Sequence, residues 1–158
     1  MSPVKYMKAL LGYKDVEAFW EAREEILKTR KKHILGRVLC KVIRRHYGSG
    51  IHVKRDIHRF HTPHGFYGIF ISKNAKIGDG CTIFHHVTIG AECCKNAGEA
   101  PTIGRNCYIG ADAKIIGNVI VGNNVRIGAN AIVVNDIPDN CTVVMNKPRV
   151  IVRKNDEI

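Results

Sequence analysis

Three histidines stand out as residues that could move a proton near neutral pH, because imidazole is the side chain whose ordinary pKa lies closest to 7. The chain contains eight histidines. His85 and His86 are adjacent, and His64 lies 21 positions before His85. An imidazole within reach of a hydroxyl takes its proton as the oxygen attacks an acyl group. We therefore take His64, His85 and His86 as the candidate catalytic residues.

The element that must position these histidines is a six-residue repeat between Ile71 and Val133. Aliphatic residues recur every six positions, apart from one gap of fourteen between Ile89 and Ile103. A helix repeats at about 3.6 residues and a strand at about two, so neither explains this period. A six-residue repeat predicts a parallel β-helix, a solenoid of short strands and turns. Its members are Ile71, Ile77, Ile83, Ile89, Ile103, Ile109, Ile115, Val121, Ile127 and Val133.

The register of the repeat places His85 and His86 at a turn. Ile83 and Val87 occupy inward positions, so the two histidines between them take turn and outer positions. A regular coil of three repeats is about 18 residues long. His64 and His85 are therefore expected on adjacent coils, near the same corner.

Two stretches exceed the six-residue spacing and are expected to protrude as loops, because a solenoid tolerates insertions at its corners. One follows Pro63, which falls on the repeat position after Ile57, and it begins with His64. The other spans residues 91–102, AECCKNAGEAPT. Loops that project from a rigid rod are favourable places for chemistry.

The chain divides into three expected segments. Residues 1–47 form a helical segment, residues 48–145 the β-helix, and residues 146–158 a tail. Within the first segment, alternating charge and apolar spacing predict helices over 15–32 and 33–46. The fold class is therefore mainly β, a parallel β-helix with an N-terminal α-helical segment.

Positive charge is concentrated in the helical segment. The net charge is +11, and residues 1–60 hold fifteen Lys and Arg against six Asp and Glu, which gives +9. The excess indicates either a solvated face on a helix that docks on the solenoid or on a sister subunit, or contact with a membrane surface or anionic polymer. Nucleic acid is not expected, because no finger, basic zipper or RNA-binding motif is present.

The cysteines favour a reduced, cytoplasmic protein. Of six cysteines, Cys81 and Cys107 occupy small-residue positions of the repeat, where they should pack as buried thiols. The N-terminus lacks the apolar core of a secretory signal, and no run of about eighteen apolar residues could span a membrane. Cys93 and Cys94 are adjacent, which is a poor chelating arrangement, and no metal site is expected.

Three stretches of the chain carry a family resemblance. They are NAKIGDGCTIFHHVTIGA (74–91), PTIGRNCYIGADAKIIGNVIVGNNVRIGANAIVVNDIPDN (101–140) and NKPRVI (146–151). On these residues, from about Gly50 to Arg149, the chain resembles the hexapeptide-repeat acyltransferases, and within them the serine acetyltransferase branch. The resemblance implies a left-handed parallel β-helix, a homotrimer with active sites between subunits, and acetyl-CoA as the donor.

The chain departs from the branch's pattern at its histidines. Serine acetyltransferases carry one histidine in a D-H-x-x-G bulge, and ungapped matching puts His64 one position early. They carry a second in an R-H-P segment, where this chain has Ala100. Colanic-acid and capsule O-acetyltransferases of the same superfamily often show R-H-G-V-T-I-G, which resembles FHHVTIG and places His85 at that histidine. The acceptor implied is therefore either serine or a sugar hydroxyl.

The resemblance also implies a mechanism of direct acetyl transfer. His64 or His85 would remove the acceptor proton as its oxygen attacks the thioester. A turn N–H near Gly90 or Gly110 would stabilise the oxyanion, with CoA along the coils beside Ala111. CoA phosphates would be drawn to Lys147, Arg149 and Arg153 in the tail.

Two other classes remain open from the residues alone. One is a non-catalytic trimeric scaffold, which the missing second histidine favours. The other is a zinc-dependent carbonic anhydrase, since trimeric β-helices of that class bind zinc through three histidines on neighbouring coils. Those spacings are not found in this sequence.

Overall fold

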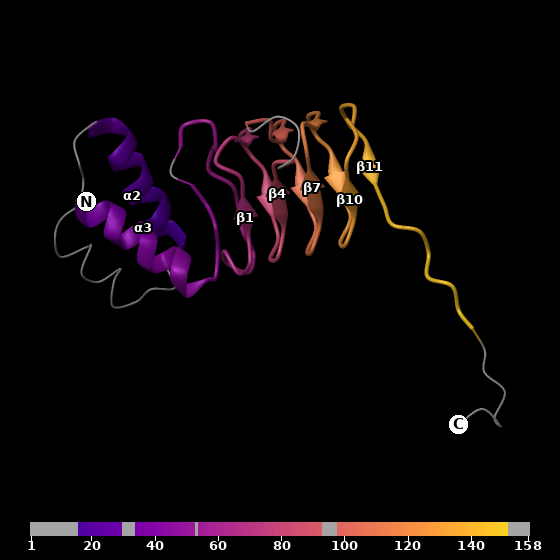
Figure 1. Cartoon of the computed structure of the whole chain (residues 1–158), viewed down its shortest axis with the longest axis horizontal. Helices are drawn as coiled ribbons and strands as arrows, with labels where there is room; N and C mark the ends of the chain where they lie inside the picture. The colour runs from indigo at the N-terminus through magenta and orange to yellow at the C-terminus, as the bar shows by residue number, and fades with distance from the viewer. Residues whose placement is uncertain (1–15, 30–33, 53, 93–97, 152–158) are drawn as a thin grey trace, which may run out of the picture.

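The computed structural model describes residues 16–29, 34–52, 54–92 and 98–151. Two helices, α2 (Val16–Thr29) and α3 (Ile34–His46), precede a row of short strands that stack along one axis (Figure 1). The strands are β1 (Phe70–Ile71), β2 (Lys76–Ile77), β3 (Thr82–Ile83), β4 (Thr88–Gly90), β5 (Thr102–Ile103), β6 (Tyr108–Ile109), β7 (Lys114–Ile116), β8 (Ile120–Val121), β9 (Arg126–Ile127), β10 (Ile132–Val133) and β11 (Thr142–Val143).

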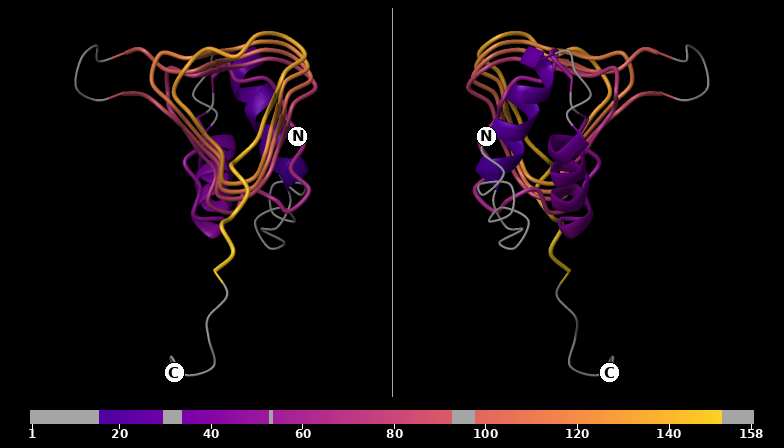
Figure 2. Two further views of the ribbon diagram at one scale, coloured as in Figure 1. Left: turned by 90° about the vertical axis from the view of Figure 1, so that its right-hand side faces the viewer. Right: turned by 90° about the vertical axis from the view of Figure 1, so that its left-hand side faces the viewer.

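The strands form three parallel sheets, which the chain visits in turn. Their orders are β1-β4-β7-β10, β2-β5-β8 and β3-β6-β9-β11. Thr102 lies opposite Ile120 and Tyr108 opposite Arg126, so a regular coil is 18 residues (102 to 120, 108 to 126). Seen along the axis, the coils superimpose as a triangle with one sheet on each side (Figure 2). The parallel β-helix expected from the six-residue repeat is confirmed.

The core of the solenoid is the repeat itself. All ten aliphatic repeat positions are buried, each with 3% or less of its surface exposed, and the small residues that follow them are equally buried. In one sheet Ile71, Ile89, Ile115 and Val133 stack in register from coil to coil. Full burial of one such side chain stabilises the fold by about 1.5–3 kcal/mol. The coils are therefore held mainly by ladders of identical aliphatic contacts.

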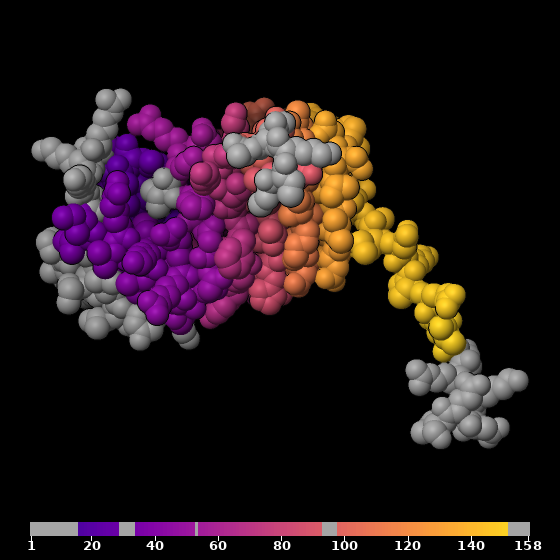
Figure 3. Space-filling view, in the orientation of Figure 1, coloured from indigo at the N-terminus to yellow at the C-terminus, as the bar shows by residue number. Residues whose placement is uncertain are grey.

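The two helices pack against the N-terminal end of the solenoid. Phe19 and Trp20 of α2 meet Phe60 and Phe66 of the first coil edge to face, with ring centroids 5.0–5.8 Å apart. Buried Arg23 of α2 donates hydrogen bonds to the carbonyl oxygens of Lys54 and Ile57. In the space-filling view this end and the coils form one body, from which the C-terminal residues extend (Figure 3).

The apolar stripe expected along residues 33–46 is split between two environments. Leu39 and Ile43 of α3 are buried, whereas Ile34, Leu35 and Val38 are 69%, 54% and 45% exposed. Residues 1–15 of the expected helical segment lie outside the described residues. Within the described residues, no helix combines the length and the apolar character that a membrane crossing requires.

The register around Pro63 differs from the expectation. His61 pairs with Thr82, so the position opposite Ile83 belongs to Thr62 and not to Pro63. The first excursion therefore begins one residue earlier than the sequence suggested, and it carries three extra residues (62 to 71 against 83 to 89). The reason lies in the spacing after Ile57, which is opposite Ile77. Ile57 and Thr62 are five residues apart, whereas the residues opposite them, Ile77 and Ile83, are six apart.

We expect Cys40, Cys81 and Cys107 to resist thiol reagents in the native protein. All three thiols are free and buried, so a reagent cannot reach them in the folded protein. Burial also raises the pKa of Cys40 to about 11, which keeps it protonated, whereas the hydrogen bond from Cys81 lowers the pKa of Cys107 to about 7, so the resistance of Cys107 depends on burial alone. Alkylation followed by peptide mass mapping should label these three only after unfolding. Half-exposed Cys141 is the internal control, because it should react in the native state. Rapid native labelling of Cys81 or Cys107 would contradict the buried ladder.

Candidate active site

One corner of the triangle is built by residues in the left-handed backbone region. Gly68, His86, Asp112 and Asn130 have φ angles of +60°, +58°, +60° and +59° and succeed one another on successive coils. The Gly68 N–H donates to the carbonyl of Tyr47, just after α3, and the N–H groups of the other three each donate to the coil before them, as His86 does to the Tyr67 carbonyl at 2.8 Å. Asparagine, aspartate and glycine are ordinary at such a position, and histidine is less common. His86 is therefore held at a defined place on the corner.

Gly68 makes room for the His86 ring. A Cβ atom at Gly68 would lie 2.3 Å from the His86 Cδ2 atom, closer than any real contact, and the φ of +60° is itself unfavourable for other residues. The first coil thus supplies the space into which the imidazole of the second coil turns.

The three candidate histidines do meet at this corner. The ring centroids of His64 and His85 are 5.4 Å apart and those of His85 and His86 are 5.1 Å apart, both edge to face. Together with Tyr67, which is 44% exposed, they line an open pocket of about 380 Å³. We call His64, His85 and His86 the imidazole cluster. The expectation that His64 and His85 lie near one corner of adjacent coils agrees with this geometry.

Asp112 joins the cluster from the next coil. Its Oδ1 lies 3.5 Å from Nδ1 of His86, and both side chains are about half exposed. The Lys114 ammonium is turned to the backbone and not to this carboxylate. Its Nζ donates hydrogen bonds to the backbone oxygens of His86 and Asp112, at 2.9 and 2.8 Å. A carboxylate beside Nδ1 favours the tautomer that carries hydrogen there and leaves Nε2 free to accept a proton.

His85 is in a different environment. Its Nδ1 is buried and has no hydrogen-bond partner among the described residues. A buried polar nitrogen without a partner costs roughly 1–3 kcal/mol, so such a group usually has a role or is completed by another molecule. Of the two adjacent histidines, His86 is thus the one with an orienting carboxylate.

Asp112 and Tyr67 are two residues of this corner that the sequence analysis does not single out. Asp112 follows His86 by 26 residues, which is one coil of 18 plus the eight residues by which the 91–102 loop lengthens that coil. The loop length was readable from the sequence. Counting it would have placed the carboxylate directly over His86.

The expected CoA-binding residues are distributed along the rod. Gly90 ends β4, and Ala111 follows β6 beside the Asp112 corner. Lys147 and Arg149 lie on the exposed segment beyond the last coil, and Arg153 lies outside the described residues. The structure corrects one detail: the Gly110 N–H donates to the Ile127 carbonyl at 2.8 Å, so it cannot serve as the oxyanion donor.

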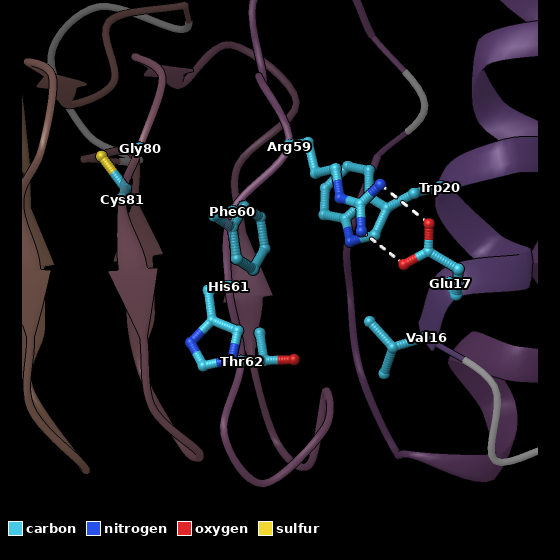
Figure 4. A pocket seen from close by; sticks show the side chains of 9 residues that line it. All are labelled: Val16, Glu17, Trp20, Arg59, Phe60, His61, Thr62, Gly80 and Cys81. Carbon is cyan, nitrogen blue, oxygen red and sulfur yellow. Dashed lines mark hydrogen bonds and ion pairs between the residues drawn. The ribbon is translucent and has the colours of Figure 1, made fainter.

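Two further pockets contain histidines, and neither brings imidazoles together. Arg37, Lys41, Arg44 and His52 line a basic pocket of about 380 Å³ on α3, where burial and nearby cations lower the pKa of His52. The other, of about 420 Å³, lies between α2 and the first coils, and its Arg59 is already paired with Glu17 (Figure 4). It is lined by Val16, Glu17, Trp20, Arg59, Phe60, His61, Thr62, Gly80 and Cys81.

Comparison with known proteins agrees with the three-sided coil. Residues 100–135 match the family described as bacterial transferase hexapeptide (six repeats). The serine acetyltransferases of Bacillus pumilus and Bacillus subtilis are each 34% identical over 155 residues, which is 97% of this chain and 71% of each relative. The fold and these matches define a hexapeptide-repeat transferase with the left-handed β-helix.

Solved structures lead to the same branch. A serine acetyltransferase isoform of Entamoeba histolytica, in complex with cysteine, superimposes with a TM-score of 0.69 at 33% identity over 87% of this chain. The Neisseria gonorrhoeae serine acetyltransferase gives 0.66 at 30% identity over 87% of this chain. The chain spans about half the length of these proteins, 49% and 53%. It belongs to the serine acetyltransferase family.

Proposed function

We propose that the protein is an acetyl-CoA-dependent O-acetyltransferase that uses the imidazole cluster to acetylate a hydroxyl. The observation that carries the proposal is the His86–Asp112 pair beside His85, at a corner pocket of a fold whose relatives are named as acetyltransferases. Histidine held by a carboxylate is a general base suited to hydroxyl chemistry.

In the proposed reaction, His86 Nε2 accepts the proton of the acceptor hydroxyl as its oxygen attacks the thioester carbonyl carbon. Asp112 holds the Nδ1–H side of the ring and stabilises the imidazolium that forms. The tetrahedral intermediate then collapses, the carbon–sulfur bond breaks, and the imidazolium returns its proton to the CoA sulfur. One ester bond replaces one thioester bond, and no covalent enzyme intermediate is required.

We infer that His85 and His64 shape the acceptor pocket beside this base. His85 lies between the other two rings, and His64 is exposed at the rim. Gly90 and Ala111 remain our candidates for contacts with pantetheine, and Lys147, Arg149 and Arg153 for the CoA phosphates. Acetyl-CoA and the packing of reduced thiols also favour a cytoplasmic location.

We infer a homotrimer with the pocket at a subunit boundary. Apolar Phe70, Ile120 and Ile132 are 52%, 58% and 65% exposed on outer faces of the coils, which is unusual for a surface that stays in water. The buried, unpartnered Nδ1 of His85 and the openness of its pocket also fit a site completed by a neighbouring protomer.

The acceptor is either serine or a sugar hydroxyl. The relatives named as serine acetyltransferases favour serine. A sugar is favoured by the position of Ala100, which is buried and provides no second imidazole where the family's R-H-P histidine would stand. The segment FHHVTIG, which contains His85, resembles instead the R-H-G-V-T-I-G segment of the sugar O-acetyltransferases.

A thiol-release assay with acetyl-CoA distinguishes these readings. The purified protein is incubated with serine, amino sugars or nucleotide sugars, and free CoA is measured. Release with serine alone establishes the first acceptor, and release only with sugars establishes the second. No release with any acceptor, together with no heat on titration with millimolar acetyl-CoA, would favour the non-catalytic scaffold.

A further inference from the structure

Three metal-ligating side chains converge at the catalytic corner. His85, His86 and Asp112 each offer one ligand atom, and these atoms all lie within 4.8 Å of one another. Ligands of a tetrahedral zinc ion stand roughly 3.3 Å apart, since each is about 2.0–2.1 Å from the metal. Side-chain rotations of about an ångström would therefore bring the three into coordination distance.

The ligand types match a particular class of ion. Two imidazoles and one carboxylate are the set used by many zinc sites that keep a position open for water or another ligand. His86 and Asp112 are on consecutive coils with matching left-handed backbones, so their separation is fixed by the solenoid. His85 adds a second imidazole, whose buried Nδ1 has no hydrogen-bond partner among the described residues.

We propose that His85, His86 and Asp112 bind a divalent transition-metal ion such as Zn²⁺, and that this binding reversibly inhibits acetyl transfer. A metal ion bound to a ring nitrogen of His86 would take up the lone pair that accepts the proton, or would draw the Asp112 carboxylate away from the ring. In either case His86 could no longer act as the general base. Only the inhibitory part rests on the proposed function. The binding part rests on the ligand geometry alone.

Lys114 opposes the ion and limits its affinity. Its ammonium lies against the backbone oxygens of two of the ligand residues. Like charges repel, and water at an open, half-exposed corner screens that repulsion. Lys114 is therefore expected to weaken binding of the ion without preventing it.

The binding test uses the untagged full chain, Zn²⁺ alone, and isothermal titration calorimetry without acetyl-CoA. We expect one Zn²⁺ per protomer. Asp112→Asn and His86→Asn should each weaken binding at least tenfold, because each replaces a strong ligand. The matched controls are His58→Asn and Asp79→Asn. His58 Nδ1 and Asp79 Oδ1 are 2.6 Å apart, an exposed His–Asp pair to which the described residues bring no third ligand.

The control variants distinguish a specific three-ligand metal site from non-specific binding to exposed histidine and aspartate. Unchanged affinity in Asp112→Asn and His86→Asn, or an equal loss in the two control variants, would overturn the site. Substitution by Co²⁺ gives a second readout, since a d–d absorption band is expected in the wild type and in the controls but not in His86→Asn.

Inhibition is measured separately, as release of CoA with and without Zn²⁺. Activity of the wild type should fall as the site fills and return with a chelator. If the wild type binds Zn²⁺ but shows no transferase activity at all, the metal site stands and the proposed function fails. If transfer proceeds at full rate with the site saturated, the inhibitory role is wrong and the proposed function stands.

Discussion

Replacing His86 with glutamine should lower kcat by about a hundredfold or more, because positioned general bases contribute about 10²–10⁴ to rate. Glutamine retains a polar side chain of similar reach but cannot take a proton near neutral pH. Asp112→Asn should lower kcat by a smaller factor, about tenfold, because the base stays in place and loses only its orienting carboxylate. Steady-state release of CoA, with the acceptor that the thiol-release assay identifies, measures both.

His85→Gln and His64→Gln are the comparisons that locate the base. Both rings lie in the imidazole cluster, and within the part of the chain that the structure describes neither ring has a carboxylate paired with it as Asp112 is with His86. We expect each variant to retain more activity than His86→Gln, with the oligomer size unchanged by light scattering. A loss at His85 as large as at His86 would move the base to His85, and full activity in all three variants would remove the site assignment.

Replacing Gly104 with alanine should destabilise the protein by about 3 kcal/mol, at the upper end of typical overpacking costs. A Cβ at this position would lie 2.5 Å from the Gly122 carbonyl oxygen and 2.6 Å from its carbonyl carbon, both backbone atoms of the next coil. Backbone cannot turn aside as a flexible side chain can, so the coils must separate locally. The reduced entropy of the unfolded chain offsets only about 0.4–1 kcal/mol.

Gly128→Ala is the matched control. Gly128 also follows a strand of the solenoid, but the nearest atom to its added Cβ is the Val143 oxygen at 3.2 Å. Thermal unfolding at one protein concentration and scan rate should lower the Tm of Gly104→Ala by roughly 6–12 °C. The control should change little. Equal shifts in the two variants would show that coil spacing is not what requires glycine at Gly104.

The fold was predictable because one physical requirement repeats. Each coil must bury an aliphatic on every side, so Ile83, Ile109 and Ile127 recur at spacings that no helix or hairpin would produce. Stacking of like residues then fixes the register without any long-range information. The exception was Pro63, where a corner one residue shorter than the others moved the pairing to Thr62.

The site was only partly predictable from the chain. His85 and His86 were placed at a corner because the flanking inward positions were clear. The role of Asp112 depends on which coil lies over which, and the 91–102 loop shifts that register by eight residues. The tautomer of His86, the unpartnered nitrogen of His85 and the position of Lys114 depend on side-chain geometry, which spacing alone does not encode.

The 18-residue pitch of the regular coil that follows the histidine corner has an evolutionary consequence. Thr102 to Ile120, Tyr108 to Arg126 and Lys114 to Ile132 are all separated by one whole turn. Duplication of such a unit would lengthen the rod and would leave unchanged both the helices at its N-terminal end and the histidine corner. Rod length and chemistry can thus diverge independently, and descendants of one ancestor can differ in span while sharing a catalytic edge.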